Sequence, residues 1–404
     1  MEKIKDLLSF FGGKEKLKEF ARQHETPAYI YAKSIVEHNF LAYQKHLSEN
    51  QGRVCVAIKA NSNPELLKIL AAHGAGVDVV SWAEAQRALD CGVPGQKIVF
   101  SGVGKRRSEL ERAIDAGLAA INVESQAEFE LIQNLCKEKQ KRVRLSFRLN
   151  PNVDANTHPK ISTGMFENKF GMDHLQVEDL YKRSHQDPWI QAVGIHFHLG
   201  SQIFTQDPYD QALDQAFTLI DQLRKQSMIV EFLNVGGGIG LREQSIEEHI
   251  HAIEMHMKKI VDESHGKNIK IFVEPGRSIF GNAGILLTQV LYRKQTSHKT
   301  FVIVDAGMND YMRPALYEAP VHLEYLGESK NHETMDLVGP VCESTDTFAK
   351  NITFTVCMQG DILAMMHVGA YGYSMSSHYN LRSRPAEFLW DGAQYRCIQE
   401  EILA

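Results

Sequence analysis

Lys59 is the first residue of this sequence whose surroundings suggest chemistry. It directly follows the apolar run VCVAI at 54–58, so a strand ending there would place a lysine amine at its carboxyl end. A lysine buried at such a place either forms a structural ion pair with a carboxylate or has its pKa lowered, which prepares the amine for Schiff-base chemistry. The position alone leaves both interpretations open.

The run GGGIG at 236–240 is a second candidate, because glycine lets backbone N–H groups approach a phosphate closely. The next apolar run along the chain ends in EPGRS, which supplies Arg277. In β/α barrels, the loops after the seventh and eighth strands commonly form a phosphate site. A tight turn beside a surface arginine is the alternative, and the placement of the two segments favours the anion site.

His198 and Glu274 add two further groups. His198 lies in the alternating segment IHFHLGS, where it is either a hydrogen-bonded core histidine, the commoner case, or a group lying flat against a planar ring. Glu274 is either a salt-bridge partner or a carboxylate that keeps a pyridine nitrogen protonated. A lysine, a phosphate-binding loop, a planar side chain and a carboxylate are together what a pyridoxal-5'-phosphate (PLP) site requires. The sequence therefore predicts PLP as the cofactor.

These residues follow a repeated pattern of elements. Apolar or β-branched runs open at eight positions: Val54, Val77, Ile98, Ala120, Val143, Val193, Val230 and Lys270. The first five are 21 to 23 residues apart, which fits a strand, a helix and two turns. Eight such units favour closure into a (β/α)8 TIM-type barrel over a doubly wound sheet. At the predicted strand ends, where barrel enzymes carry their reactive groups, stand Lys59, Asp78, Ser101, Glu124, Arg148 with Asn150, His198, Gly236–Gly238, and Glu274 with Arg277.

The pattern changes after Gly284. Five strand-like runs with few helical stretches between them predict a second, mainly β domain, at 286–292, 301–305, 335–341, 352–357 and 386–390. The early run TPAYIYA at 26–32 is expected to pair with this domain. We therefore expect a PLP-binding barrel over 36–284 and a β domain assembled from 1–35 and 285–404.

The connection from Pro151 to about Ile190 is too long for a plain crossover. It contains the segment NVDANTHPKISTGMFENKFG, rich in Gly, Asn and His, and we expect a functional loop there.

Composition excludes several function classes. The net charge is −6 and the pI about 6.3, so there is no electrostatic footprint for nucleic acid or an acidic membrane. The N-terminal segment MEKIKDLLSFFGGKEK is charged throughout, unlike a signal peptide, and no run approaches the roughly 20 apolar residues of a membrane span. The six cysteines lack CxxC spacing, which argues against a metal site or a disulfide framework. A cytoplasmic location is expected.

Longer motifs carry a family resemblance. In the barrel they are AIKANSN (57–63), GAGVDVVSWAE (74–84), HFHLGSQ (196–202), NVGGGIG (234–240) and EPGRSI (274–279). In the β domain they are MNDYMRPALY (308–317), GPVCESTD (339–346) and GAYGYSMSSHYNLRSRPAE (369–387). With these motifs the chain resembles the alanine-racemase-like, fold type III PLP enzymes, and within them the diaminopimelate decarboxylase family, from about residue 25 to 395. Taken together the motifs are highly specific.

The resemblance implies a role for each matching residue. Lys59 would hold PLP covalently, His198 would stack on its ring and Glu274 would face the pyridine nitrogen. The other cofactor-binding residues would be Asp78, Ser201, Gly236, Gly237, Gly238, Gly276, Arg277 and Tyr371. Cys342 would donate a proton, and the substrate contacts would be Arg277, Arg313, Tyr317, Glu343 and Tyr371. Val56 departs from the family pattern, which often has an aromatic residue before Ala-x-Lys. We expect this difference to affect the packing near the cofactor and not the chemistry.

The resemblance further implies PLP-dependent decarboxylation of meso-2,6-diaminopimelate to L-lysine, the last step of lysine biosynthesis. In this family the CES segment reaches the neighbouring subunit's site, which implies a homodimer with shared active sites. Three other functions are alternatives to this decarboxylase activity. A decarboxylase of ornithine, arginine or lysine usually has an acidic distal pocket without the paired arginine. A racemase would use a tyrosine as second acid/base and lacks the CES segment. A binding protein without activity is disfavoured because every catalytic position carries a competent residue.

Overall fold

The chain divides into two compact units in the computed structural model, which describes residues 7–47, 51–155, 163–165, 167–242 and 244–402. The barrel unit comprises Asn39–Leu241 and Ile250–Ser278. The β unit comprises Met1–His38, Arg242–His249 and Ile279–Ala404. The predicted boundaries at 36 and 284 fall near these divisions, although the prediction left Arg242–His249 with the barrel.

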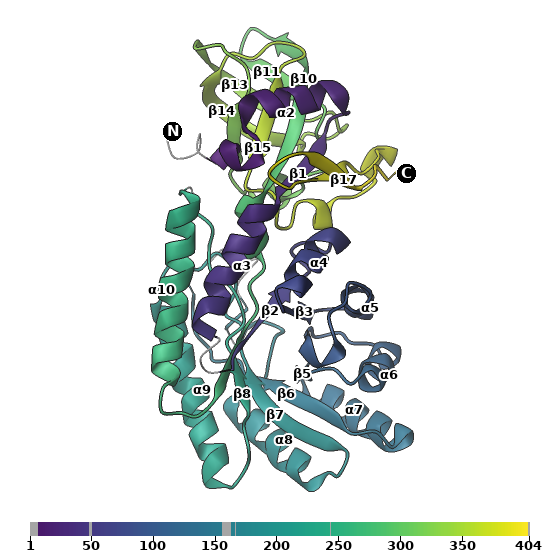
Figure 1. Ribbon diagram of the computed structural model, residues 1–404, viewed down its shortest axis with the longest axis vertical. Helices are drawn as coiled ribbons and strands as arrows, with labels where there is room; N and C mark the ends of the chain where they lie inside the picture. Colours follow the sequence, from purple (N-terminus) through teal and green to yellow (C-terminus); the bar gives the residue numbers. More distant parts are fainter. Residues whose placement is uncertain (1–6, 48–50, 156–162, 166, 243, 403–404) are drawn as a thin grey trace. The chain divides into compact units, whose positions relative to one another are not determined.

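Eight parallel strands close into a barrel in the barrel unit (Figure 1). They are β2 (Arg53–Ala57), β3 (Gly76–Val79), β4 (Ile98–Phe100), β5 (Ala120–Val123), β6 (Val143–Arg148), β7 (Ile190–His196), β8 (Phe232–Asn234) and β9 (Lys270–Val273). Each strand pairs with the next along the chain, and β2 pairs with β9 through Arg53↔Phe272, which completes the ring. The predicted (β/α)8 barrel is therefore confirmed.

Helices precede and connect these strands. They are α3 (Lys33–Leu47), α4 (Pro64–Ala72), α5 (Trp82–Asp90), α6 (Arg107–Ala116), α7 (Gln126–Lys139), α8 (His174–Gln186), α9 (Asp207–Lys225), α10 (Ile246–Ser264) and the short α11 (Arg277–Phe280). The local sequence sets several helix starts, because the side chains of Asn63, Ser81 and Ser125 each accept a hydrogen bond from a backbone N–H of the first turn. Such caps fix the point at which each loop ends and hold the strand-end residues before it in place.

A layer of apolar side chains fills the barrel. Its members are buried residues of six different strands: Cys55, Val99, Ala120, Val193, Phe232 and Phe272. The two phenylalanine rings stack with centroids 4.3 Å apart. Gly194 makes room for them, since a Cβ there would come within 2.5 Å of the Phe232 ring. The barrel is thus a packed core, in which each fully buried side chain contributes about 1.5–3 kcal/mol, and not a pore.

The β unit contains a nine-stranded sheet. Its strands are β1 (Ala28–Ala32), β10 (Gly284–Gln295), β11 (Thr300–Val304), β12 (His322–Tyr325), β13 (His332–Val338), β14 (Thr347–Thr355), β15 (Ile362–Met366), β16 (Ala386–Trp390) and β17 (Tyr395–Gln399). The order is β14-β13-β11-β10-β1-β16-β17, and β15 pairs with both β10 and β12. Helices α2 (Gly13–Gln23) and α12 (Arg313–Tyr317) belong to the same unit.

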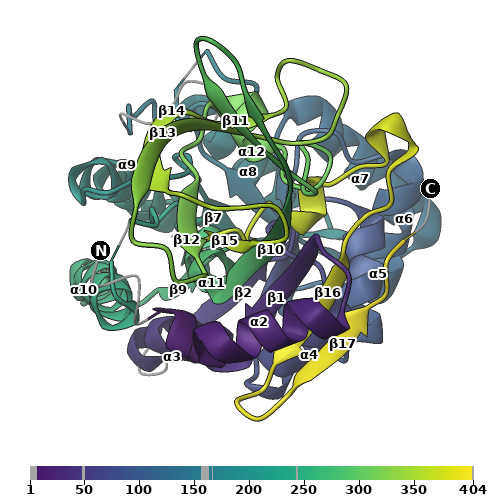
Figure 2. The ribbon, with the colours of Figure 1, turned by 90° about the horizontal axis from the view of Figure 1, so that it is seen from above.

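Strand β1 lies inside this sheet, between two strands from the other end of the chain (Figure 2). It runs antiparallel to β10, with Ala28 opposite Leu287, and parallel to β16, with Ala28 opposite Ala386. All five of its residues are buried. The expected pairing of the N-terminal strand with the β domain is confirmed.

Two features differ from the prediction. Strands β12, β15 and β17 were not expected. Strands β12 and β17 are short, and most of their residues are half-buried. They therefore lack the alternation of apolar and polar residues that marks a strand. The long connection before β7 contains α8, so the loop proper runs from the end of β6 to His174. Of the expected functional loop, residues 156–162 and 166 lie outside the described residues.

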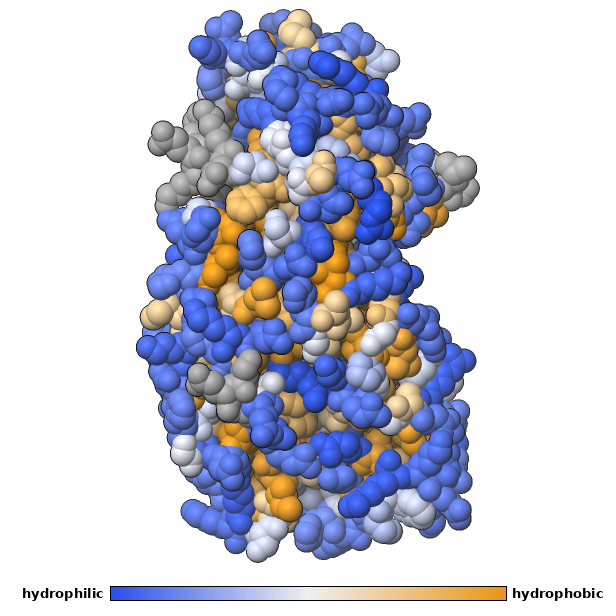
Figure 3. Space-filling view, in the orientation of Figure 1, coloured by the Kyte–Doolittle hydropathy of each residue, from blue (hydrophilic) through white to orange (hydrophobic). Residues whose placement is uncertain are grey.

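One face of the molecule is mostly hydrophilic. Hydrophilic residues cover most of the face shown in Figure 3, with apolar side chains in smaller groups between them. Among the helices of the described part of the chain, none combines the length and the apolar character needed to cross a membrane.

Candidate active site

The carboxyl ends of the barrel strands carry most of the predicted site residues. Lys59 lies two residues after β2, Ser101 and Glu124 directly follow β4 and β5, and Arg148 ends β6. Asp78 is the third residue of the four-residue β3 and so lies within the strand. Because the strands are parallel in a closed barrel, all these side chains gather at one end of it.

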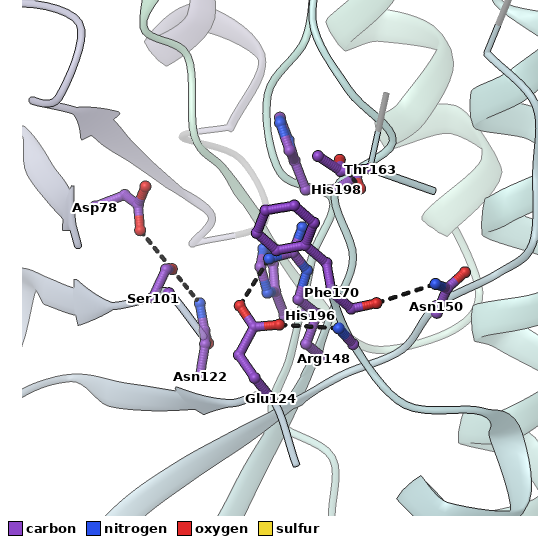
Figure 4. Close-up of polar contacts among 12 residues, drawn as sticks. Asp78, Ser101, Asn122, Glu124, Arg148, Asn150, Thr163, Phe170, His196 and His198 are labelled. Atoms are coloured by element: carbon purple, nitrogen blue, oxygen red, sulfur yellow. Dashed lines mark hydrogen bonds and ion pairs between the residues drawn. The ribbon is translucent and has the colours of Figure 1, made fainter. Parts of the chain in front are cut away.

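Lys59 faces a buried carboxylate. Its Nζ lies 3.5 Å from Oδ2 of Asp78, whose side chain has no exposed surface, while the lysine side chain is 36% exposed. The other carboxylate oxygen accepts a hydrogen bond of 2.5 Å from the Ser101 hydroxyl, and the Asn122 side-chain amide donates to the same hydroxyl over 2.9 Å (Figure 4). An amine at the rim and a carboxylate in the core are thus joined to a chain of polar groups across neighbouring strands.

Opposing effects act on the pKa of Asp78. Burial raises the pKa of its carboxyl to about 7, and the negative charge of Glu274 acts in the same direction. The positive charge of Lys59 and the hydrogen bond from Ser101 oppose that rise. Asp78 can therefore gain or lose a proton near neutral pH, in response to small changes around it.

Glu274 is held as an anion by two buried partners. The Asn234 amide donates to Oε1 over 2.7 Å, and the His196 imidazole lies 3.3 Å from Oε2. Burial alone would raise the pKa of Glu274, but the charge and hydrogen bond of His196 outweigh it and lower this pKa to about 2. A fixed carboxylate of this kind can stabilise a protonated nitrogen placed against it.

His198 presents a neutral ring. Its Nδ1 accepts a hydrogen bond of 3.1 Å from the Gly237 N–H, so the proton of the neutral imidazole is at Nε2. Burial, together with the positive charges of Lys59 and Arg148, holds the pKa of His198 well below its usual value. An uncharged ring with a fixed plane is suited to lie against another flat ring.

The glycine run is packed too tightly for any side chain. A Cβ on Gly237 would approach the Glu274 carbonyl to 2.2 Å, and one on Gly238, where φ is +122°, would approach the Gly200 carbonyl to 2.7 Å. Two of the three N–H groups are already used, since Gly236 donates to the Asn234 side chain and Gly237 to His198. Of the predicted phosphate-binding glycines, Gly238 is the one in this run whose N–H is best placed to serve a ligand.

Arg277 supplies a cation near the same loops. Its Nε and Nη2 each lie 3.2 Å from the Ser201 hydroxyl, to which they donate. Gly276 comes directly before it, and a Cβ there would meet the Ala60 side chain at 3.0 Å. Ser201, Gly276 and Arg277, which the motifs predicted for one phosphate site, are therefore close together in the barrel unit.

Glu124, Arg148 and Asn150 hold the end of the loop that leads to α8. Arg148 donates to Glu124 over 2.7 Å, and both side chains are almost fully buried. The second Glu124 oxygen accepts from the Gly171 N–H, and the Asn150 amide donates to the Phe170 carbonyl over 3.0 Å (Figure 4). These three strand-end residues have structural partners, which explains their polarity without a catalytic role.

The remaining predicted residues lie in the β unit. Cys342 is exposed, and its backbone N–H donates to the Asn380 side chain over 3.1 Å. The Glu343 carboxylate accepts from the hydroxyls of Thr345 and, over 2.8 Å, Tyr379, and these two bonds lower the pKa of Glu343.

Three further predicted residues complete this set. Arg313 and Tyr317 are the ends of α12, with the guanidinium 5.5 Å from the phenol ring centroid. Tyr371 has a left-handed backbone, with φ 58°.

Some residues of these networks were not predicted. Asn122 lies inside β5, whereas His196 and Asn234 are the last residues of β7 and β8. Strand alternation, which places His196 on the same side as His198, and the strand-end position of Asn234 could have indicated these two. Tyr379 and Asn380 belong to a short turn, and no periodic signal distinguishes them. Across the described ranges, no group of three or more His, Cys, Asp or Glu side chains could hold a metal ion.

Comparison with known proteins places these observations in context. The family model described as pyridoxal-dependent decarboxylase, pyridoxal binding domain, matches residues 33–281. The diaminopimelate decarboxylase of Pseudomonas aeruginosa is 41% identical over 379 residues, which cover 94% of this chain and 91% of that protein. That of Aquifex aeolicus is 38% identical over 385 residues, covering 95% and 91%. The crystal structure of diaminopimelate decarboxylase from Helicobacter pylori complexed with L-lysine has a TM-score of 0.91 at 38% identity and covers 96% of each chain.

Proposed function

This chain belongs to the diaminopimelate decarboxylase family of pyridoxal-dependent enzymes, and we propose that it converts meso-2,6-diaminopimelate to L-lysine and carbon dioxide with PLP as cofactor. One observation supports the proposal: an amine and an ionised carboxylate lie at the same end of the barrel. An amine, Lys59, stands 3.5 Å from a carboxyl of finely balanced charge, and a carboxylate, Glu274, is held ionised. These are the two groups that a PLP site needs at its opposite ends.

The residues of the barrel unit fit PLP. Lys59 would hold the cofactor covalently, and the neutral ring of His198 would stack on it. Glu274 would keep the pyridine nitrogen protonated, which deepens the electron sink that bound PLP supplies as carbon dioxide leaves. The phosphate would be bound by Ser201, Gly236–Gly238, Gly276 and Arg277, with Tyr371 as a further contact. The close-packed glycines support this assignment, because they allow the backbone at Gly238 to approach a ligand directly.

We assign the return of a proton to Cys342. After carbon dioxide has left, the substrate carbon must take up a proton from one face. A thiol suits this role because it can donate a proton over a short reach to a carbon placed beside it. The exposed position of Cys342 within its own unit is consistent with the proposed homodimer, in which the CES segment serves the site of the neighbouring subunit.

The substrate carries a second ammonium and a second carboxylate at its far end. A guanidinium pairs bidentately with a carboxylate, so Arg277 and Arg313 are assigned to the distal carboxylate. Glu343 is assigned to the distal ammonium, and its lowered pKa supports a charge of the required sign. Tyr317 and Tyr371 would add neutral hydrogen bonds.

The experiment is to incubate the PLP-loaded protein with meso-diaminopimelate and measure lysine and carbon dioxide. Both should form in equal amounts, and borohydride should fix the cofactor to Lys59 alone. Lys59→Ala should abolish turnover, whereas Lys225→Ala, at an exposed lysine of α9, should not. A PLP-loaded protein that forms no lysine, or that decarboxylates ornithine efficiently, would overturn the proposal.

A further inference from the structure

A directed chain of hydrogen bonds leads from the barrel interior to Lys59. It runs from Asn122 on β5 to Ser101 after β4 and then to Asp78 on β3 (Figure 4). The other Asp78 oxygen lies beside the lysine amine. Asp78 and Asn122 have no exposed surface and Ser101 is 5% exposed, so water does not supply alternative partners. Within the part of the chain described, Asn122 Oδ1 forms no hydrogen bond, so the amide is oriented by the serine alone.

The donors and acceptors fix the direction of this chain. The Asn122 N–H donates to the Ser101 oxygen, so the one hydroxyl proton is left for Asp78. A carboxylate that receives such a bond is stabilised in its ionised form. A protonated Asp78 would carry its proton on Oδ2 and accept only a neutral hydrogen bond at Oδ1, whereas the ionised carboxylate accepts a stronger, charge-assisted bond from Ser101. The bond from Ser101 therefore favours the ionised form of Asp78.

We propose that Ser101 and Asn122 are positioning residues that favour the ionised form of Asp78 and aim it at Lys59, and thereby favour the protonated form of the lysine amine until the cofactor arrives. The inference rests on the proposed function only in taking Lys59 as the reactive lysine. It assigns a task to two side chains that touch neither the amine nor, by their burial, a ligand.

Other charges around Asp78 do not replace this task. Glu274 after β9 and Glu84 on α5 both bear on it, and both are negative, so they disfavour its ionisation. Lys59 is the cation that favours it, and Ser101 is the hydrogen-bond donor. Without the serine hydroxyl, the positive charge of Lys59 still favours ionisation of Asp78, whereas the negative charges of Glu274 and Glu84 disfavour it.

The test uses protein free of PLP and follows modification of Lys59 by acetic anhydride, since only the neutral amine reacts. Mass spectrometry gives the rate for the Lys59 peptide, with the exposed Lys225 as internal reference. Ser101→Ala should raise the Lys59 rate about threefold at about pH 7.5, because Asp78 becomes protonated and the amine loses one of the negative charges that act on it, beside those of Glu84 and Glu274. At about pH 10 the difference should vanish, because Asp78 is ionised there in both proteins.

Matched variants distinguish the loss of the Ser101 hydrogen bond from a general disturbance of the folded structure. Ser101→Thr keeps the hydroxyl and should behave as wild type, and Asn122→Ala should show a smaller change of the same sign. Ser146→Ala removes a hydroxyl that is equally buried on β6 but forms no hydrogen bond within the described residues, and it should change nothing. Asp78→Asn should raise the rate at both pH values, and adding Ser101→Ala to it should have no further effect.

An unchanged Lys59 rate in both Ser101→Ala and Asn122→Ala, when Asp78→Asn is faster, would overturn the inference. So would an equal increase in Ser101→Thr. Folding of each variant is checked by circular dichroism, and Asn122→Ala still decides the matter if Ser101→Ala does not fold. Because neither PLP nor substrate is present, the result is independent of whether the decarboxylase assignment holds.

Discussion

Replacing Asp78 by asparagine should change how stability depends on pH. The carboxyl has an ordinary pKa of 3.8 and, in the folded protein, a pKa raised to about 7 by burial and by Glu274. The folded state therefore binds this proton more tightly than the unfolded state. Stability contributed by the group is complete below about pH 4 and is lost as the pH rises to about 7.

The magnitude follows from the same values. A difference of about three pKa units corresponds to at most about 4 kcal/mol, since each unit is worth about 1.4 kcal/mol. Between about pH 4 and pH 7, the wild type should lose this much stability relative to Asp78→Asn, which carries no such proton. In a unit of this size, each kcal/mol corresponds to about 2–4 °C in melting temperature.

Differential scanning calorimetry of the cofactor-free protein at a series of pH values measures the effect. The quantity of interest is the melting temperature of Asp78→Asn minus that of wild type, which cancels other groups such as Asp310, whose pKa burial also raises to about 7. The difference should grow with pH and level off above about 7. Asp115→Asn is the control of opposite sign, because hydrogen bonds from Lys139 and Lys141 lower the pKa of that exposed carboxyl. Parallel profiles for wild type and Asp78→Asn would refute the reasoning.

Three further predictions concern the proposed reaction. Mixing inactive Lys59→Ala and Cys342→Ala proteins should restore part of the decarboxylase activity, because one hybrid site receives both intact residues; subunit exchange without any recovery would exclude shared sites. Arg313→Ala should lower the kcat/KM for meso-diaminopimelate by orders of magnitude, since leaving a desolvated charge unpaired costs about 2–5 kcal/mol, while the PLP content measured by absorbance stays the same. Tyr379→Phe removes a hydrogen bond to Glu343 and should raise KM more than it lowers kcat. In a Glu343→Gln background the same change should have little further effect on either constant. A large additional loss of kcat/KM there would contradict a role through Glu343.

The barrel could be predicted because its signal is repeated. The first five apolar runs have a spacing close to 22 residues, and helices with side-chain caps follow several of them, which leaves few alternatives for the chain. Strands β12 and β17 could not be predicted in this way, because a half-buried edge strand needs neither an apolar run nor strict alternation. Their place depends on neighbours distant in sequence, such as β15 for β12.

Two of the candidate site residues could be named from the sequence because each follows a predicted strand. Lys59 and Glu274 follow strands, and their neighbours form recognisable motifs. Their partners Asn122, His196 and Asn234 were not named, because they are ordinary polar residues within or at the end of apolar strand runs. Their importance comes from which side chains they meet across the barrel, and that depends on the strand register. The prediction that all three glycines at 236–238 bind phosphate also could not anticipate that two of their N–H groups have protein partners.

The position of β1 has a consequence for synthesis of the chain on the ribosome. This strand emerges among the first segments, yet β10 begins only at Gly284 and β16 at Ala386. Until β10 emerges, the apolar segment AYIYA lacks both strands that pair with it, and until β16 emerges it lacks one of them, whereas the barrel residues between β1 and β10 are already complete. The nascent chain thus carries an unpaired strand through most of translation, which is the kind of exposed edge that chaperones protect and that aggregation exploits. A chain that stops before β16 would release β1 with one side of its backbone unpaired, so the segment 386–404 at the very end of translation decides whether the first strand is buried.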